Sequence, residues 1–337
     1  MSRRLGLALL LTLVAPVAAA QSFAELAADA GPAREQRPRE GARKEETVNL
    51  YTSNAAPTIQ ALAADFEKRH GVRLNVWRAS SNKVLQRLLA EQQAGRWEFD
   101  AVSISAPELE ALYREGLLQE TRAAAQDDMI AGAMPAHRGW APQFINVFVQ
   151  AYNTRTVRRD ELPRHWRDLL DPRWKGRLGV EANASEWYCA LAGTEGAEVL
   201  PRIVAGNGVS VRQGNSLLAN MVVTGEVPLA LAVYEHMIDE AKAKGAPVDS
   251  FALGPLVARA NGIGVSRRPP HPHAAQLFYE YNLGAAQPLL VKLHYSSPLR
   301  RLANGSKMVF VDPAMDGAAL ARCNSAYEAL LKGQAWR

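Results

Sequence analysis

The sequence predicts an α/β protein with enough chain for two domains. The chain has 337 residues, more than one ordinary globular core accommodates. Between residues 47 and 116, strand-like stretches alternate with stretches of helical periodicity, and the links are short. This alternation is typical of a parallel sheet covered by helices on both faces. Hydrophobic residues make up 48% and charged residues 22%, a composition that favours a globular chain over a disordered one.

The amino-terminal residues 1–20 have the order of a secretory signal peptide. The Arg3-Arg4 pair supplies a positive start, Leu5–Val17 is mostly apolar, and Ala18–Ala20 offers the small residues that a signal peptidase accepts. We expect cleavage before Gln21. The alternative is a membrane anchor, but the apolar run is shorter than the ~20 residues that span a bilayer. No later segment is apolar enough to span a membrane, so we expect an exported, soluble protein.

A polar lead-in, residues 21–46, follows the signal peptide. It is rich in Ala, Arg, Glu, Gly and Pro, and Arg34–Glu46 is almost wholly polar. Such a segment has little apolar surface to bury. We therefore expect a flexible tether that adds nothing to the core.

Three strand–helix pairs are predicted after the lead-in. Each strand is a short apolar run followed by a helix start: Pro57 suits the first turn of one helix, and Ser105 with Glu108 has capping-box spacing at another. Right-handed crossovers would place the three strand ends on one edge of the sheet. The predicted strands are 48–51, 72–77 and 99–104, and glycines 71, 95 and 116 end the helices.

A second α/β block is predicted from Phe144 onward, with the same mixture of apolar runs and helical periodicity. The predicted strands are 144–152, 178–180, 209–211, 227–234, 248–253 and 256–265. The predicted helices are 186–192, 215–224, 235–244, 272–283, 286–294 and 318–331.

Charge and motifs exclude several classes of function. The formal charge of +5 falls to about +3 once Arg3 and Arg4 are removed (5 − 2 = 3), and the basic residues are scattered. Nucleic-acid binding is therefore not expected, and the mild positive field favours an anionic solute only weakly. The chain has no Gly-x-Ser-x-Gly elbow, no Walker-type phosphate loop and no His-Glu-x-x-His motif. We expect a binding protein and not an enzyme.

Short stretches along the chain resemble the type 2 periplasmic solute-binding proteins, specifically the iron(III)-type group of ABC transporter receptors. Each stretch is short, and their order and spacing carry the resemblance. They include a "Trp-x-Asp-Leu, Asp-Pro-x-Trp-Lys-Gly" pattern and a "Phe, charged pair, Gly, Val" helix end. The matching stretches are Val48–Tyr51, Phe66–Val72, Glu98–Val102, Glu115–Leu118, Trp166–Gly176, Gly225–Glu226, Lys244–Val248 and Pro270–Ala275.

The resemblance implies the two-lobed type 2 periplasmic binding protein fold. Each lobe would be a central, mostly parallel sheet flanked by helices, with a hinge and an interlobe cleft. Lobe 1 would hold 47–140 and 248–300, and lobe 2 would hold 141–247 and 301–337. The cleft would close on a small solute by movement about the hinge.

The resemblance also implies a partner and a location. The protein would be a monomeric receptor in the periplasm that delivers a small-molecule or metal-ion solute to an ABC permease in the inner membrane. The alternative is a periplasmic ligand sensor that feeds a two-component regulatory system. A permease and an ATPase among the neighbouring genes would favour transport, and a sensor kinase would favour the alternative.

The two cysteines, Cys189 and Cys323, permit a disulfide. Export places them in an oxidising compartment, where a structural disulfide persists, and the alternative is two buried free thiols. The lobe layout that the resemblance implies puts both residues in lobe 2. That layout favours the disulfide.

Small polar residues at the predicted strand ends of lobe 1 are candidates for solute binding. Solutes of open α/β sheets lie beyond the carboxyl ends of the strands. Helix starts there suit a carboxylate, phosphate or phosphonate group, because they present unpaired N–H groups. The alternative is that these side chains only cap their helices. The candidates are Ser53, Asn54, Ser80, Ser81, Ser103 and Ser105.

On lobe 2 the candidates are Glu186, Trp187, Asn215 and Tyr234, of which Tyr234 ends a strand. We expect Tyr234 to be an aromatic cleft wall against an organic anion, including one of phosphonate type. Ferric receptors of the family use two adjacent tyrosines with a His and a Glu of the first lobe. This sequence departs from that set, because Glu235 and His236 follow Tyr234 and the first predicted strand ends in Thr52-Ser53-Asn54 without a His. A different metal site of Tyr234, Glu235 and His236, holding Fe(III), is the alternative. No other cofactor is expected.

Overall fold

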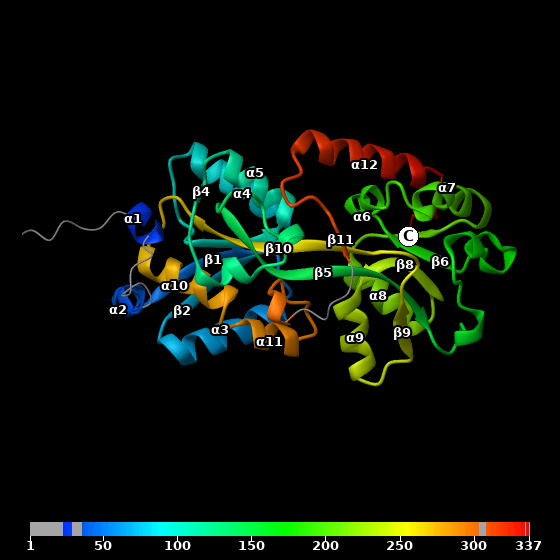
Figure 1. Ribbon diagram of the computed structural model, residues 1–337, viewed down its shortest axis with the longest axis horizontal. Helices are drawn as coiled ribbons and strands as arrows, with labels where there is room; N and C mark the ends of the chain where they lie inside the picture. The colour runs from blue at the N-terminus through cyan, green and yellow to red at the C-terminus, as the bar shows by residue number, and fades with distance from the viewer. Residues whose placement is uncertain (1–22, 29–35, 303–307, 334, 337) are drawn as a thin grey trace, which may run out of the picture.

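The computed structural model describes residues 23–28, 36–302, 308–333 and 335–336. Figure 1 shows an elongated molecule in which two groups of helices and strands lie side by side, joined by the long strands β5 and β10. The predicted α/β class is confirmed. The predicted signal peptide, 1–20, lies outside the described residues. Within the described ranges, no helix has the length and apolar character needed to cross a membrane.

The described strands join in one sheet. Its main path runs β12-β7-β6-β8-β5-β10-β3-β1-β2, with β4 and β11 paired to β10, and β9 paired to β5. The strands are β1 Thr47–Thr52, β2 Arg73–Arg78, β3 Ala101–Ser105, β4 Leu118–Gln119, β5 Trp140–Asn153, β6 Leu178–Glu181, β7 Ser210–Arg212, β8 Leu229–Tyr234, β9 Val248–Phe251, β10 Leu256–Ser266, β11 Met308–Phe310 and β12 Ala335–Trp336.

Helices cover both faces of this sheet (Figure 1). The α-helices are α1 Phe23–Ala28, α2 Gln36–Glu45, α3 Ala56–His70, α4 Ser81–Gln93, α5 Ala106–Arg114, α6 Ser185–Ala190, α7 Glu195–Asn207, α8 Asn215–Thr224, α9 Glu235–Ala243, α10 Pro272–Leu283, α11 Gln287–Lys292 and α12 Gly317–Leu331. Short 3-10 helices are η1 Ala124–Asp128, η2 Ala131–Ala133, η3 Arg159–Glu161, η4 Trp166–Leu170, η5 Pro172–Trp174 and η6 Arg300–Leu302.

The first group of elements follows the predicted strand–helix order. β1 pairs in parallel with β2 on one side and β3 on the other, and α3, α4 and α5 follow the three strands. Gly71 ends α3 with φ 73°, a left-handed conformation that glycine adopts at low cost. The carboxyl ends of β1, β2 and β3 therefore lie on one edge, where α4 and α5 begin.

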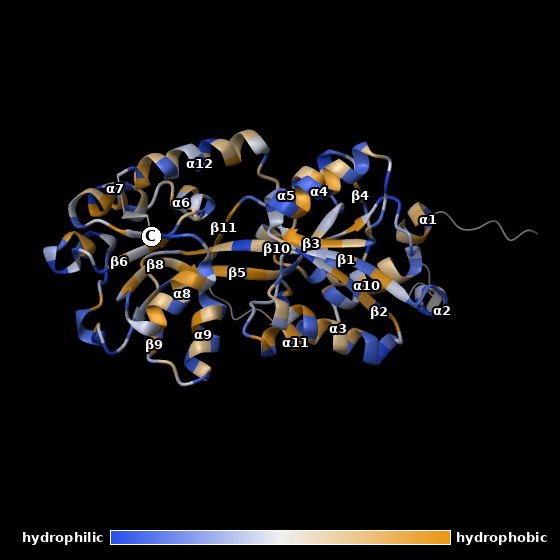
Figure 2. Cartoon of the chain, turned by 180° about the vertical axis from the view of Figure 1, so that it is seen from behind, coloured by the Kyte–Doolittle hydropathy of each residue, from blue (hydrophilic) through white to orange (hydrophobic). Residues whose placement is uncertain are grey.

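The second group repeats this arrangement with β6, β7 and β8. β6 pairs in parallel with both β7 and β8, so their carboxyl ends also share one edge. Trp166 and Trp174, expected to be packing residues, are buried in the core of this group. Figure 2 shows that strands at the centre of the sheet, β5 among them, are largely hydrophobic, as a sheet covered on both faces requires.

β5 and β10 connect the two groups. They pair antiparallel over most of their length; β10 also pairs with β3 of the first group, and β5 pairs with β8 of the second. Every residue of β5 is buried. Gly262 lies at an irregularity of this ladder, and a Cβ there would lie 2.9 Å from the Ala141 carbonyl oxygen. Only glycine permits that close approach.

The expectation that the lead-in adds nothing to the core is wrong for its described part. α2 packs on α10, and Ala42 of α2 is fully buried in a hydrophobic cluster with that helix. Small residues permit this contact: a Cβ at Gly41 would lie 2.2 Å from the His273 ring. The Glu45 carboxylate accepts a hydrogen bond of 2.8 Å from Ala274 N, in the first turn of α10. A polar helix thus docks through two small residues and a carboxylate at a helix start.

Candidate functional site

Three predicted serines come together at the strand ends of the first group. The Ser81 hydroxyl donates to Ser53 Oγ at 3.0 Å and lies 3.1 Å from Ser105 Oγ. Ser105 is the residue before α5, and its side chain makes no capping hydrogen bond. We call Ser53, Ser81 and Ser105 the hydroxyl cluster. It brings neutral donors and acceptors to the starts of α4 and α5.

The other first-lobe candidates lie elsewhere. Asn54 and Ser103 are buried: Asn54 donates to Ser103 Oγ at 3.1 Å and to Gln143 at 2.9 Å, and it accepts from Asn261 at 2.9 Å. These hydrogen bonds connect the segment after β1 with β3, β5 and β10. Ser80 precedes α4, is exposed, and makes no side-chain cap. The structure therefore gives Asn54 and Ser103 a supporting role within the sheet.

A buried ion pair lies at the facing edge of the second group. Arg259 of β10 donates from Nη1 to Glu186 Oε2 at 2.8 Å and from Nη2 to the Tyr234 hydroxyl. The Arg259 side chain is 16% exposed and that of Glu186 is 9% exposed. Glu186 comes from α6 and Tyr234 ends β8. Two of the predicted lobe 2 residues thus meet around an arginine that lies in the joining strand.

Glu108 of α5 faces this pair from the first group, and we call Glu108, Glu186, Tyr234 and Arg259 the charged cluster. Burial, with the negative charge of Glu186, raises the pKa of Glu108 to about 7. Burial raises the pKa of Tyr234 to about 12, so its phenol is protonated at neutral pH. Burial alone would lower the pKa of Arg259, but the charge of Glu186 raises it, and the guanidinium stays cationic.

A cavity of about 250 Å³ lies between the two groups at the charged cluster. Its walls come from the starts of α4, α5 and α6, from β10 and from α12. In the described part of the chain, two buried polar atoms of its lining lack a hydrogen-bond partner: Glu108 Oε2 and Arg259 Nε. The lining residues are Asn82, Glu108, Ala182, Asn183, Ser185, Glu186, Arg259, Leu320, Asn324, Tyr327 and Glu328.

The remaining lobe 2 candidates divide between the site and the core. Asn215 begins α8 and follows Gly214, whose N–H donates to Glu181 at 2.9 Å. Glu181 ends β6; burial raises the pKa of its carboxyl group, and the nearby positive charge of Arg259 opposes that rise. Trp187 is only 1% exposed and packs against Trp166. Asn215 therefore lies at the edge of the site, whereas Trp187 belongs to the core.

The structure does not bring Tyr234 and Glu235 into one cavity. Glu235 lines a separate cavity with Asp239 and His294, and the Tyr234 hydroxyl meets Arg259. Tyr234 is the last residue of β8 and Glu235 the first of α9, so their side chains diverge. Among the described residues, no group of three or more His, Cys, Asp or Glu is placed to hold a metal ion.

α12 closes one side of the cavity and is bonded to α6. A disulfide joins Cys189 of α6 to Cys323 of α12, with the two Cα atoms 5.8 Å apart. Nearby, Ser185 donates to Asn324 at 2.6 Å, and the Tyr327 hydroxyl donates to the Glu181 carbonyl at 2.8 Å. The helix that carries Glu186 is thereby fixed to the helix that covers it.

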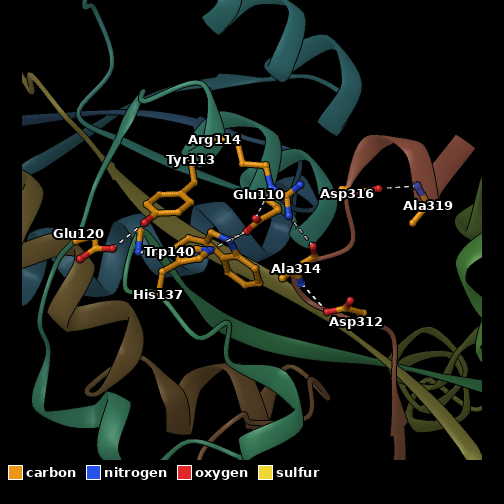
Figure 3. A network of polar contacts seen from close by, with 11 residues as sticks. Glu110, Tyr113, Arg114, Glu120, His137, Trp140, Asp312, Ala314, Asp316 and Ala319 are labelled. Atoms are coloured by element: carbon orange, nitrogen blue, oxygen red, sulfur yellow. Dashed lines mark hydrogen bonds and ion pairs between the residues drawn. The ribbon is translucent and has the colours of Figure 1, made fainter.

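The other end of α12 is attached to the first group. Figure 3 shows Arg114, in the last turn of α5, between the Glu110 carboxylate and the Ala314 carbonyl, at 2.7 and 3.0 Å. Asp316 then caps α12 by accepting from Ala319 N at 2.6 Å. α12 consequently contacts both groups across the cavity.

Three features of the site were not predicted from the sequence. They are Arg259, the place of Glu108 at the cavity, and the cover that α12 provides. The available signal for Arg259 was a lone arginine inside the apolar run 256–265. A charge in a strand buried on both faces needs a partner or a ligand. Glu108 was recognised only for its spacing from Ser105. Nothing local in the sequence indicates which element covers the cavity.

Comparisons with known proteins cover most of the chain. Residues 48–295 match the family of bacterial extracellular solute-binding proteins. Iron uptake protein A1 of Synechocystis is 23% identical over 278 residues, 76% of each chain. The periplasmic binding protein AfuA of Actinobacillus pleuropneumoniae, solved with fructose-6-phosphate, has a TM-score of 0.71 and 17% identity over 85% of this chain and 99% of its own. Iron-bound HitA of Pseudomonas aeruginosa has a TM-score of 0.66 and 20% identity over 85% and 98%.

Proposed function

The chain belongs to the bacterial extracellular solute-binding protein family, and from this premise we propose that it is the periplasmic receptor of an ABC importer for a small organic anion. The family and the structural neighbours are binding proteins and not enzymes. The comparisons give no support to the ligand-sensor alternative. In this proposal the solute is trapped between two lobes and delivered to an inner-membrane permease.

The observation that carries the choice of an anion is Arg259. It is a buried cation at a cavity between the two groups of elements, and its Nε has no partner in the described part of the chain. A guanidinium forms strong, directed hydrogen bonds with carboxylate and phosphate oxygens. Ser81 precedes the lining residue Asn82, and Ser105 lies three residues before the lining residue Glu108, so these helix starts add neutral donors beside the cavity. An anionic group of the solute would bind Arg259 and these donors together.

The proposed lobes are 47–140 with 248–300, and 141–247 with 301–337. Under this division the cavity lies between lobes, with Glu108 from one and Glu186 from the other. A solute shifts the open–closed equilibrium only by binding the closed form better. A solute held by Arg259 of the first lobe and Asn183 of the second would do so, because the closed form brings the two lobes together.

Ferric iron is the rival solute, since Iron uptake protein A1 is named for iron and HitA was solved with iron bound. Metal ligands must be deprotonated. Here the Tyr234 phenol receives a hydrogen bond from Arg259, and its pKa is raised to about 12. A guanidinium beside the phenol repels a trivalent cation. These features favour an organic anion over iron.

Native mass spectrometry of protein purified from the periplasm tests the proposal. We expect a bound organic molecule that carries a carboxylate, phosphate or phosphonate, and we expect it to be lost in Arg259→Gln. Arg158→Gln, an exposed arginine that pairs with Asp160, is the matched control and should retain it. Bound iron without an organic molecule would overturn the proposal.

A further inference from the structure

We infer that the solute carries an amino group as well as an anionic group, with the ammonium on Glu108 and the oxyanion on Arg259. This inference rests on the proposed function and narrows its substrate class. The two residues line the same cavity, Glu108 from α5 and Arg259 from β10. Each presents a buried polar atom without a partner among the described residues: an acceptor, Glu108 Oε2, and a donor, Arg259 Nε.

The two unpaired atoms need opposite hydrogen-bond partners, because Glu108 Oε2 accepts a hydrogen bond and Arg259 Nε donates one. Arg259 already pairs with Glu186, whereas no described basic side chain forms an ion pair with Glu108. A buried carboxylate without a cation is costly and is rare unless a ligand or metal completes it. An ammonium offers three donors to such a carboxylate. An acceptor and a donor that line one cavity fit a solute with both groups.

The balance of charges around the cavity also favours a solute with both an amino group and an anionic group. The buried and half-buried part of the lining holds two carboxylates, Glu108 and Glu186, and one guanidinium, Arg259. A simple anion bound to Arg259 would add a further negative charge beside Glu108. A simple cation would be attracted to Glu108 but would leave Arg259 Nε unpaired. A solute with separated ammonium and oxyanion satisfies both residues without bringing a surplus charge.

The size and polarity of the cavity also fit a solute with both groups. Its volume of about 250 Å³ suits a molecule of amino-acid dimensions. Asn82 of α4 and Asn183 of the loop before α6 add amide donors and acceptors near the charged groups. The amine and the acid need not share one carbon atom, because Glu108 and Arg259 come from two separate elements, α5 and β10.

Matched probe pairs test the inference. The probes are 4-aminobutyrate against butyrate, and 2-aminoethylphosphonate against ethylphosphonate. Each is titrated calorimetrically into full-length mature protein freed of its solute. We expect the amino member of at least one pair to bind about tenfold tighter than its amine-free partner. Glu108→Gln should bring that ratio close to one. Glu198→Gln, an exposed glutamate of α7, is the matched control and should keep the ratio.

The outcomes separate this inference from the proposed function. Binding of both members with equal affinity overturns the amino-group requirement and leaves the anion receptor standing. An amino preference that survives Glu108→Gln also overturns it, since another group would then hold the amine. Binding of ferric citrate with no response to any organic probe overturns the proposed function itself.

Discussion

The two walls of the cavity are built from different chemistry. The wall from α4 and α5 contributes Asn82 and Glu108 and lies beside the hydroxyl cluster, whose neutral side chains bond to one another. The wall from α6, β8 and β10 carries Arg259 held by Glu186 and Tyr234. Neutral hydroxyls cost little to leave without a ligand, but buried charges need partners. The charged wall should therefore govern both stability and affinity.

The largest expected effect is at Arg259. Arg259→Gln should lower solute affinity about 100-fold, because a buried charge-assisted hydrogen bond to the solute is lost. It should also lower the free energy of unfolding by about 3 kcal/mol, because Glu186 is left without its cation. Calorimetric titration and urea unfolding measure the two effects. The double variant Glu186→Gln/Arg259→Gln should recover most of the stability and none of the affinity. Recovery of affinity would assign Arg259 a structural role only.

The disulfide between Cys189 and Cys323 should have the next largest effect. Replacing both cysteines by serine should lower the free energy of unfolding by about 2–4 kcal/mol, and loosen the contact of α6 with α12 beside Glu186. Chemically reduced wild-type protein should show the same loss. Thiol titration of unfolded protein from the periplasm should find no free cysteine; two thiols per chain would contradict the pairing.

Glu108 should make the stability of the solute-free protein depend on pH. Burial, then Glu186, raises its folded pKa to about 7 from the usual 4.5, so its ionisation destabilises the fold as pH rises between these values. Glu108→Gln should raise the free energy of unfolding by about 1–3 kcal/mol at pH 8 and by almost nothing at pH 4. The charged or titratable groups around Glu108 are Glu181, Glu186, Tyr234, Arg259, Tyr327 and Glu328. An equal gain at both pH values would contradict the assignment.

The smallest effects compare the two walls directly. Tyr234→Ala should weaken solute binding about tenfold, because it removes a hydrogen-bond partner that holds Arg259 in place. Ser81→Ala should weaken it about twofold to threefold, the loss of one neutral hydrogen bond. Titration of both variants with the same solute gives the comparison. A larger loss for Ser81→Ala would reverse the ranking of the walls.

Much of the fold was predictable because its signals are local. Apolar runs, glycine stops and polar helix starts lie within ten residues of one another, and β1 through α5 follow them closely. The hydroxyl cluster was predictable for the same reason, since parallel strands bring their ends together. The docking of α2 was not, because it depends on Gly41 and Ala42 meeting α10 more than 200 residues away.

The charged cluster was only half predictable. Glu186 and Tyr234 lie near the predicted strand ends, where solutes of such sheets bind. Arg259 lies inside a strand, and Glu108 lies in a helix for which only a capping role was expected. Their roles arise from four elements that meet across the cavity, and single-sequence patterns do not show such meetings. A buried arginine in an apolar strand is the one local sign that deserved a functional interpretation.

The most direct test of the anion receptor is a crystal structure of the protein with the solute it carries from the periplasm. We expect an oxyanion of that solute within hydrogen-bond distance of Arg259, in the cavity between α5, α6 and α12. A solute bound elsewhere, or a metal ion held by Tyr234 with Arg259 turned away, would contradict it.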